Sequence, residues 1–216
     1  MLKLNQGDVV LHLSTARLHG WYQEPTRDNP VVVFAQANSG TRHSANDRFV
    51  AEQLIEAGFG TLLFDLLTEE EDRAYQNRSD IPLLSSRLVE AVRWSELATV
   101  GERVPMALYG ANTGAAAALA AAETLGTEIR ALVSHEGRVD LAAGALPQVR
   151  CPTLFLVGGL DLEGVLATRD AMQRMPSQTV KEMQVVPGAT PLFEEPGALA
   201  RAVELARDWF RTYAVR

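Results

Sequence analysis

The sequence predicts an α/β protein whose central sheet is mostly parallel, with antiparallel N-terminal strands and helices on both faces. Three observations support this prediction. Residues 7–22 read as two short strands around a turn at 14–16. The run VVVFA at 31–35 is continuously apolar, which is typical of a strand buried on both faces. From there onward, apolar runs alternate with segments of helical periodicity, the order that builds a parallel sheet.

The elements of the first half follow in chain order. Residues 45–58 predict a helix, and FGTLLFDLL at 59–67 is the next strand. The helix is expected to bury the face that carries Phe49, Val50, Leu54 and Ile55. Residues 68–80, TEEEDRAYQNRSD, form a polar connection whose acidic residues we expect to face solvent. An amphipathic helix follows, from Ile81 to about Leu97.

The second half continues the alternation to the C-terminus. Strands are predicted at 105–110, 129–135, 151–159 and 180–188, and helices at 113–125 and 163–174. A closing helix carries the apolar positions Leu199, Val203, Ala206 and Phe210. We treat residues 1–216 as a single domain. Ligands of such sheets bind at the carboxyl ends of the strands, so the turns that follow the strands are where a site is expected.

The amino-acid composition limits the kinds of molecule that the protein is expected to bind. The net charge of −7 and pI of about 5.2 argue against a nucleic-acid surface. No run of residues suggests a membrane span or a leader, and the single cysteine, Cys151, suits a reducing cytoplasm. The four histidines have no paired spacing, so neither a metal nor another cofactor is expected. The expected partner is a small-molecule ligand, and a homodimer is the oligomer considered.

The stretch LYGANTGAAAALA at 108–120 reads as a strand, a glycine-flanked turn and an alanine-rich helix. Asn112 stands at the centre of the turn, between Gly110 and Gly114. Asparagine tolerates positive φ better than most residues, so Asn112 either contacts a ligand through its amide or only stabilises the turn. The backbone N–H of Thr113 opens the helix and adds a site that favours an anion.

Several motifs together carry a family resemblance. They are SGTRHS at 39–44, LLFDLLTEEE at 62–71, GANTGAAAAL at 110–119, GRVDLA at 137–142, CPTLFLVGGLD at 151–161 and PGATPLFEEPGAL at 187–199. With these motifs in this order, the chain resembles the α/β-hydrolase superfamily, and within it the dienelactone-hydrolase-like proteins, from about residue 18 to 213. The resemblance implies the α/β-hydrolase fold without a separate cap domain. It also implies a place for each member of a Ser–His–acid triad.

The chain departs from that triad at two of its three positions. By the resemblance, Asn112 stands where the family has its nucleophilic serine, and Pro191 stands where the family has its histidine. Asp161 matches the acid, and Gln36–Ala37 replaces the His-Gly pair of the oxyanion loop. An amide is no useful nucleophile and proline is no base, so ordinary serine hydrolase activity is not expected.

Other side chains at the same rim could supply acid–base chemistry without a covalent intermediate. His135 and Glu136 follow the strand next to the turn strand, and Asp161 is the third candidate catalytic residue. Each has a structural alternative. His135 could be a loop histidine bonded to backbone, Glu136 could form an ion pair with Arg138 or another arginine, and Asp161 could be a helix N-cap. The ligand-binding candidates are Asn112, Thr113, Gln36, Ala37 and Asn38.

Three functional hypotheses follow. The first is an enzyme that carries out an elimination, cyclisation or isomerisation of a small molecule by acid–base chemistry, with the amides of Asn112 and Gln36 polarising the substrate. The second is a non-catalytic protein that binds a ligand on a hydrolase scaffold. The third is weak hydrolysis of an ester or lactone by an activated water. The first is favoured over the second because the rim carries several polar side chains.

Overall fold

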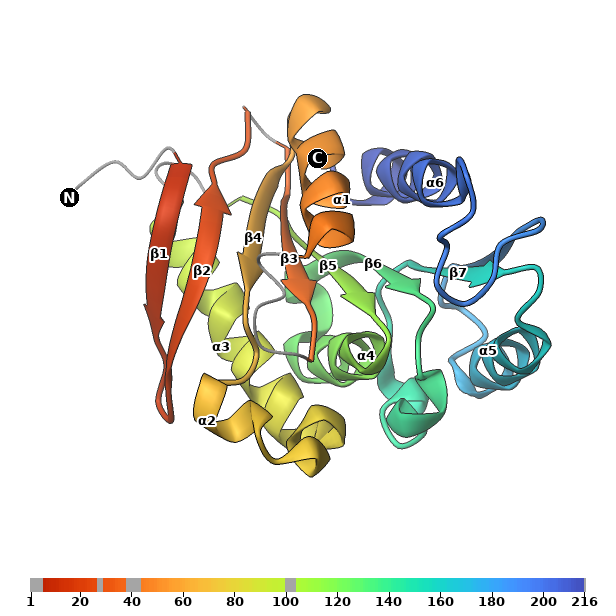
Figure 1. The fold of residues 1–216 in the computed structure, drawn as a ribbon, viewed down its shortest axis with the longest axis horizontal. Coiled ribbons are helices and arrows are strands. Elements are labelled where there is room, and N and C mark those ends of the chain that lie inside the picture. The colour runs from red at the N-terminus through yellow and green to blue at the C-terminus, as the bar shows by residue number, and fades with distance from the viewer. Residues whose placement is uncertain (1–5, 27–28, 38–43, 100–103, 216) are drawn as a thin grey trace.

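The structure, a computed structural model, describes residues 6–26, 29–37, 44–99 and 104–215. These residues form one eight-stranded sheet in the order β1-β2-β4-β3-β5-β6-β7-β8 (Figure 1). β1 pairs antiparallel with β2, and β2 pairs antiparallel with β4, while the strands from β4 to β8 pair in parallel. The mostly parallel sheet with antiparallel N-terminal strands that the sequence predicts is therefore confirmed.

The strands and helices lie close to their predicted positions. The strands are β1 Gln6–His12, β2 Arg17–Gln23, β3 Val31–Ala35, β4 Gly60–Phe64, β5 Met106–Ala111, β6 Ile129–His135, β7 Thr153–Gly158 and β8 Lys181–Val186. The helices are α1 Ala45–Glu56, α2 Glu69–Asp72, α3 Ile81–Ala98, α4 Thr113–Leu125, α5 Leu162–Arg174 and α6 Ala198–Tyr213. Short 3-10 turns lie at Tyr75–Ser79, Gly126–Glu128, Val139–Ala142 and Leu146–Gln148.

Helices cover both faces of the sheet, as Figure 1 shows. α1 and α6 pack on one face, in a core that includes Val50, Leu54 and Phe210. α3, α4 and α5 pack on the other, in a core that includes Leu88, Leu119 and Ala171. Every residue of β3, β4 and β5 is buried, because these central strands are covered on both sides. No helix of the described chain is both long and apolar enough to cross a membrane.

The predicted inner face of α1 is wrong at one position. Val50 and Leu54 are buried as expected, but Phe49 is 36% exposed. The helix is turned so that the side chain of Asp47 faces inward beside Val50, Ala51 and Leu54. The Gln36 side chain holds this carboxylate by a hydrogen bond of 2.6 Å from Nε2 to Oδ1. The face that α1 turns toward the sheet therefore carries a polar contact beside its apolar side chains.

The segment 68–80 is also more structured than predicted. It contains α2, which opens with a capping box between Thr68 and Glu71, a pattern visible in the sequence TEEE. Glu71 does not simply face solvent, because it pairs with the guanidinium of Arg87, a side chain that is 1% exposed. Hydrogen bonds from Arg87 are the main reason that the pKa of Glu71 falls to about 2.

Candidate functional site

A cavity of about 200 Å³ opens at the carboxyl ends of β3, β5 and β6. This is the edge of the sheet at which the sequence predicts the site. Its polar lining comes from Gln36, Ser44, Asn46, Asp47, Tyr109, Asn112, His135 and Glu136. Val50, Ala111, Leu192 and Leu199 complete it. Among the described residues of this lining there is no lysine or arginine.

Asn112 forms the turn between β5 and α4, with φ of 52° and ψ of −126°. Its backbone carbonyl accepts hydrogen bonds from the N–H groups of Ala115 and Arg138, and its own N–H donates to the carbonyl of His135. Its side chain is exposed at the cavity and does not cap the helix. The turn is therefore held through its backbone, and the amide side chain is left facing the cavity.

The flanking glycines are required by packing. A Cβ on Gly114 would lie 2.0 Å from the carbonyl oxygen of Ala35, at the end of β3. A Cβ on Gly110 would lie 2.7 Å from the Cα of Ala115. Both contacts are with backbone, which cannot move aside as a flexible side chain can. The two glycines let the start of α4 sit directly against β3 and β5.

His135 ends β6 and is 6% exposed. Its Nδ1 lies 2.7 Å from the hydroxyl of Tyr109, and its ring packs edge-on against Phe193, with centroids 4.5 Å apart. Burial lowers the pKa of His135 to about 4, so the ring is neutral at pH 7. The alternative of a backbone-bonded loop histidine is wrong, since the ring is bonded to a tyrosine.

Glu136 follows at once, in a backbone conformation with φ of 50°. Its carboxyl is 9% exposed, and Oε1 is buried with no hydrogen-bond partner among the described residues, as is Nε2 of His135. The two atoms are 3.8 Å apart. Burial raises the pKa of Glu136 to about 8, with help from the charges of Asp161 and Glu195. The predicted alternative of an ion pair with Arg138 is wrong, since Arg138 bonds Asp140.

Asp47 and Tyr109 are site residues that the sequence did not single out. Asp47 is 6% exposed, and burial raises the pKa of its carboxyl. Its spacing with Val50, Ala51 and Leu54 on a helical face was the available signal. Tyr109 is 1% exposed. In the pairing of β5 with β6 it lies opposite Val133, two residues before His135, and its buried hydroxyl is hydrogen-bonded to the His135 ring.

The remaining predicted site residues lie outside the described cavity lining. Asp161 is the N-cap of α5, where its Oδ1 accepts a hydrogen bond of 2.9 Å from the N–H of Gly164. It is absent from the described cavity lining, as are Thr113, the first residue of α4, and Ala37, which is buried. Pro191 is exposed, in the loop that brings Leu192 to the cavity. Asn38 lies outside the described residues.

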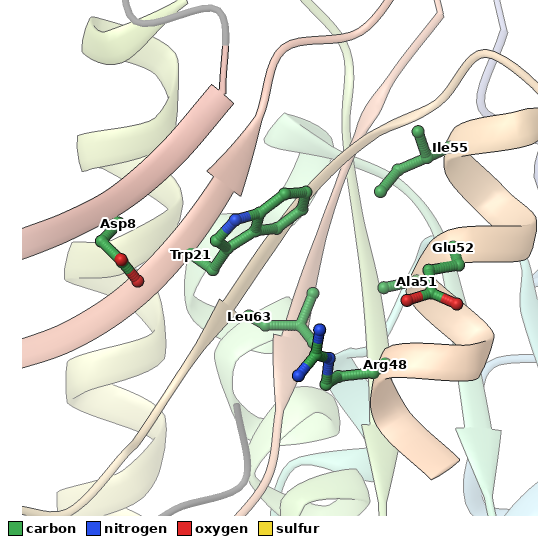
Figure 2. A pocket seen from close by; sticks show the side chains of 7 residues that line it. All are labelled: Asp8, Trp21, Arg48, Ala51, Glu52, Ile55 and Leu63. Atoms are coloured by element: carbon green, nitrogen blue, oxygen red, sulfur yellow. The ribbon is translucent and has the colours of Figure 1, made fainter. Parts of the chain in front are cut away.

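A second hollow, of about 220 Å³, lies between α1 and the outer strands (Figure 2). Trp21 and Leu63 form its floor, and Arg48 and Glu52 project from α1 at its side. Both charged side chains are exposed. The hollow contains none of the predicted site residues and lies away from the ends of β5 and β6. It therefore lacks the convergent buried polar groups of the first cavity.

Comparison with known proteins agrees with this architecture. The family model described as "Dienelactone hydrolase family" matches residues 18–213. A dienelactone hydrolase of Anabaena variabilis is 40% identical, with a TM-score of 0.91, and the match covers 97% of this chain and 98% of that one. Est1E of Butyrivibrio proteoclasticus shares the fold, with a TM-score of 0.78, at 13% identity over 95% of this chain and 98% of its own.

A relative in Mycobacterium tuberculosis, named "Putative phosphoribosyl transferase Rv0571c", is 46% identical over 207 residues. The match covers 96% of this chain but only 46% of that protein, so the chain spans about half the length of this curated relative. The matches to the family model and to the Anabaena structure both run over nearly the whole chain. The chain belongs to the dienelactone hydrolase family.

Proposed function

We propose that the protein acts on a small molecule by acid–base chemistry without a covalent intermediate, in an elimination, a cyclisation or an isomerisation. One observation carries this proposal. Nε2 of His135 and Oε1 of Glu136 are both buried and unpartnered among the described residues, 3.8 Å apart, in the lining of one cavity. Buried polar atoms are seldom left without a partner, so such a pair suggests that a ligand completes it.

Glu136 is the proposed general acid. A carboxyl whose pKa is about 8 carries its proton at pH 7 and can donate it to a ligand. A pKa close to the working pH is what efficient proton transfer requires. Asp161 supports this role from outside the cavity lining, because its negative charge at the start of α5 helps to keep Glu136 protonated.

Asp47 is the proposed base. Its carboxylate lines the same cavity and is oriented by the side-chain amide of Gln36, in the loop after β3. Burial raises the pKa of Asp47, which strengthens it as a base relative to a carboxylate in water. An acid and a base on different strands and helices of one cavity can move two protons of a bound ligand. Asn112 supplies an amide that orients this ligand.

The names of the relatives bear on the ligand in different ways. The Anabaena protein is called a dienelactone hydrolase, which supports a ligand with a lactone or related carbonyl group. The mycobacterial name, by contrast, describes a protein of which this chain spans less than half. Because the match covers less than half of that protein, we do not extend phosphoribosyl transfer to this cavity.

The proposal is tested by ligand binding and turnover together. A panel of small lactones, enones and hydroxy ketones is incubated with the protein, and each mixture is followed by mass spectrometry. We expect conversion of at least one compound and no acylated protein. Glu136→Gln should still bind that compound but convert it about 10²-fold more slowly or worse, as expected when a general acid is lost. Glu123→Gln, on the exposed side of α4, is the matched control and should behave like wild type.

Two outcomes contradict the proposal. A compound that binds in the cavity and is released unchanged under all conditions supports the ligand-binding hypothesis instead. Conversion that persists in Glu136→Gln and proceeds through an acylated side chain would show that the protein is a covalent hydrolase.

A further inference from the structure

The hydroxyl of Tyr109 is hydrogen-bonded to one of the two ring nitrogens of His135, and this contact bears on which nitrogen carries the ring proton. Tyr109 is 1% exposed, and its ring is fixed by Phe34, with centroids 5.0 Å apart. The hydroxyl lies 2.7 Å from Nδ1 of His135, which is its hydrogen-bond partner in the described structure. A phenol has one proton to donate, and a buried donor needs an acceptor.

The phenol remains protonated at all ordinary pH values. Burial raises its pKa, and the negative charge of Asp47 raises it further. The neutral imidazole has one nitrogen that accepts and one that donates. When Tyr109 donates to Nδ1, that nitrogen must be the acceptor, and the ring proton is left on Nε2.

The Nε2–H group then faces the cavity beside Glu136. Nε2 has no partner among the described residues, and the distance of 3.8 Å to Oε1 of Glu136 is too long for a hydrogen bond. The edge-on contact with Phe193, at an interplanar angle of 87°, keeps the ring from turning. The gap between the two polar atoms suits one acceptor atom of a ligand.

We infer that Tyr109 is a positioning residue that holds His135 as its Nε2–H tautomer, so that His135 and Glu136 together present two neutral hydrogen-bond donors to a carbonyl oxygen of the ligand. Donors placed where negative charge develops are among the largest contributions to catalysis. The ligand class rests on the proposed function; the tautomer does not.

The tautomer is measured directly by long-range ¹H–¹⁵N NMR of the uniformly labelled protein at pH 7. His135→Gln identifies the signals of this ring. We expect a pyrrole-type Nε2 and a pyridine-type Nδ1 in the wild type. Tyr109→Phe should replace this pattern by a mixture of the two tautomers, because the donor to Nδ1 is lost. Tyr22→Phe is the matched control: Tyr22 is also buried and bonds a hydroxyl, that of Thr99 at 2.9 Å.

The wild-type spectrum alone decides the inference if Tyr109→Phe does not fold. A protonated Nδ1 in the wild type, or an unchanged tautomer in a folded Tyr109→Phe, overturns it.

The ligand class is tested with δ-valerolactone and tetrahydropyran, two six-membered rings that differ only by a carbonyl group. The lactone should shift the Nε2–H signal of His135 in a saturable way, and the ether should not. Equal shifts, or none with the lactone, would overturn the assignment of a carbonyl ligand while the tautomer result stood. The failure of the proposed function would be seen separately, as the absence of turnover.

Discussion

The turn after β5 and the end of β6 are neighbours in the sheet, but they differ in how deeply their side chains are buried. At the turn, Asn112 retains a strained backbone conformation, while its side chain is exposed and has no capping role. At the end of β6, the polar atoms of His135 and Glu136 are buried, and the pKa values of both side chains are shifted. A strained turn can thus leave its side chain exposed while the buried titratable groups lie on the neighbouring strand.

The origin of this contrast is solvent access. The side chain of Asn112, at the tip of the β5 turn, is exposed where it lines the cavity. The residues at the end of β6 are instead covered by Phe193, which comes from the loop after β8. Burial then penalises the charged form of each group, so that the histidine loses its proton and the glutamate keeps one. Variants of both regions and measurements across pH test whether the turn and the strand end differ in this way.

The largest effect is expected at the backbone of the turn. Gly114→Ala would place a Cβ 2.0 Å from the carbonyl oxygen of Ala35 and force α4 away from β3. We expect a loss of more than about 4 kcal/mol in the free energy of unfolding, or no folded protein at all. Urea unfolding followed by circular dichroism measures it. Gly144→Ala is the control, because a Cβ at Gly144 meets nothing within 4 Å. Equal stability of the two variants would show that the turn is not packed as described.

A smaller effect is expected in the pH dependence of stability. The folded protein keeps the proton of Glu136 up to pH about 8, whereas the unfolded chain loses it near 4.5. Stability should therefore fall as the pH rises from 6.5 to 8, by at most about 1.4 kcal/mol per pH unit for one proton. His135 acts in the opposite sense, since its folded pKa of about 4 makes stability rise between pH 4 and 6.5.

Glu136→Gln should abolish the decline between pH 6.5 and 8, and Glu123→Gln should retain it. Unfolding midpoints at four pH values in this range provide the test. The groups that face Glu136 are His135, Asp161 and Glu195, from β6, the start of α5 and the loop after β8. A decline of the same slope in wild type and Glu136→Gln would mean that another group holds the proton.

The smallest effect is expected at the side chain of the turn. Asn112→Ser places a hydroxyl at the centre of the turn, and we propose that the exposed Pro191 leaves it without a base. We expect stability within about 1 kcal/mol of wild type, because the backbone makes the contacts of this turn. Hydrolysis of 4-nitrophenyl acetate should stay at the level of wild type. A burst of nitrophenolate with an acyl group on the introduced serine would show that an alternative base is already in place.

Most of the fold was predictable, because hydrophobic periodicity and turn residues agree along the chain. The helix predicted at 113–125 is α4 itself, and the strand predicted at 129–135 is β6. The inward position of Asp47 was not predictable, since its partner Gln36 lies in the loop after β3. α2 was missed although its capping box is local, because its acidic run was interpreted as solvated surface.

The candidate site was predictable only in part, for a physical reason. His135 and Glu136 follow from their place after a strand, and Gln36 and Asn112 from theirs. Burial cannot be read from a strand-end position, so the direction of the pKa shifts needed the structure. The role of Tyr109 was not predictable, because its partner His135 becomes visible only once β5 is paired with β6. Asp161 matched a motif, yet its oxygen caps a helix.

The central claim is that a protonated carboxyl at Glu136 faces the cavity at neutral pH. ¹³C NMR of the glutamate side-chain carboxyls, recorded across a pH titration, tests this claim most directly. We expect one carboxyl signal that titrates near pH 8 in the wild type, and that is missing from Glu136→Gln but present in Glu123→Gln. A titration in which every glutamate carboxyl of the wild type ionises below pH 6 would contradict the account.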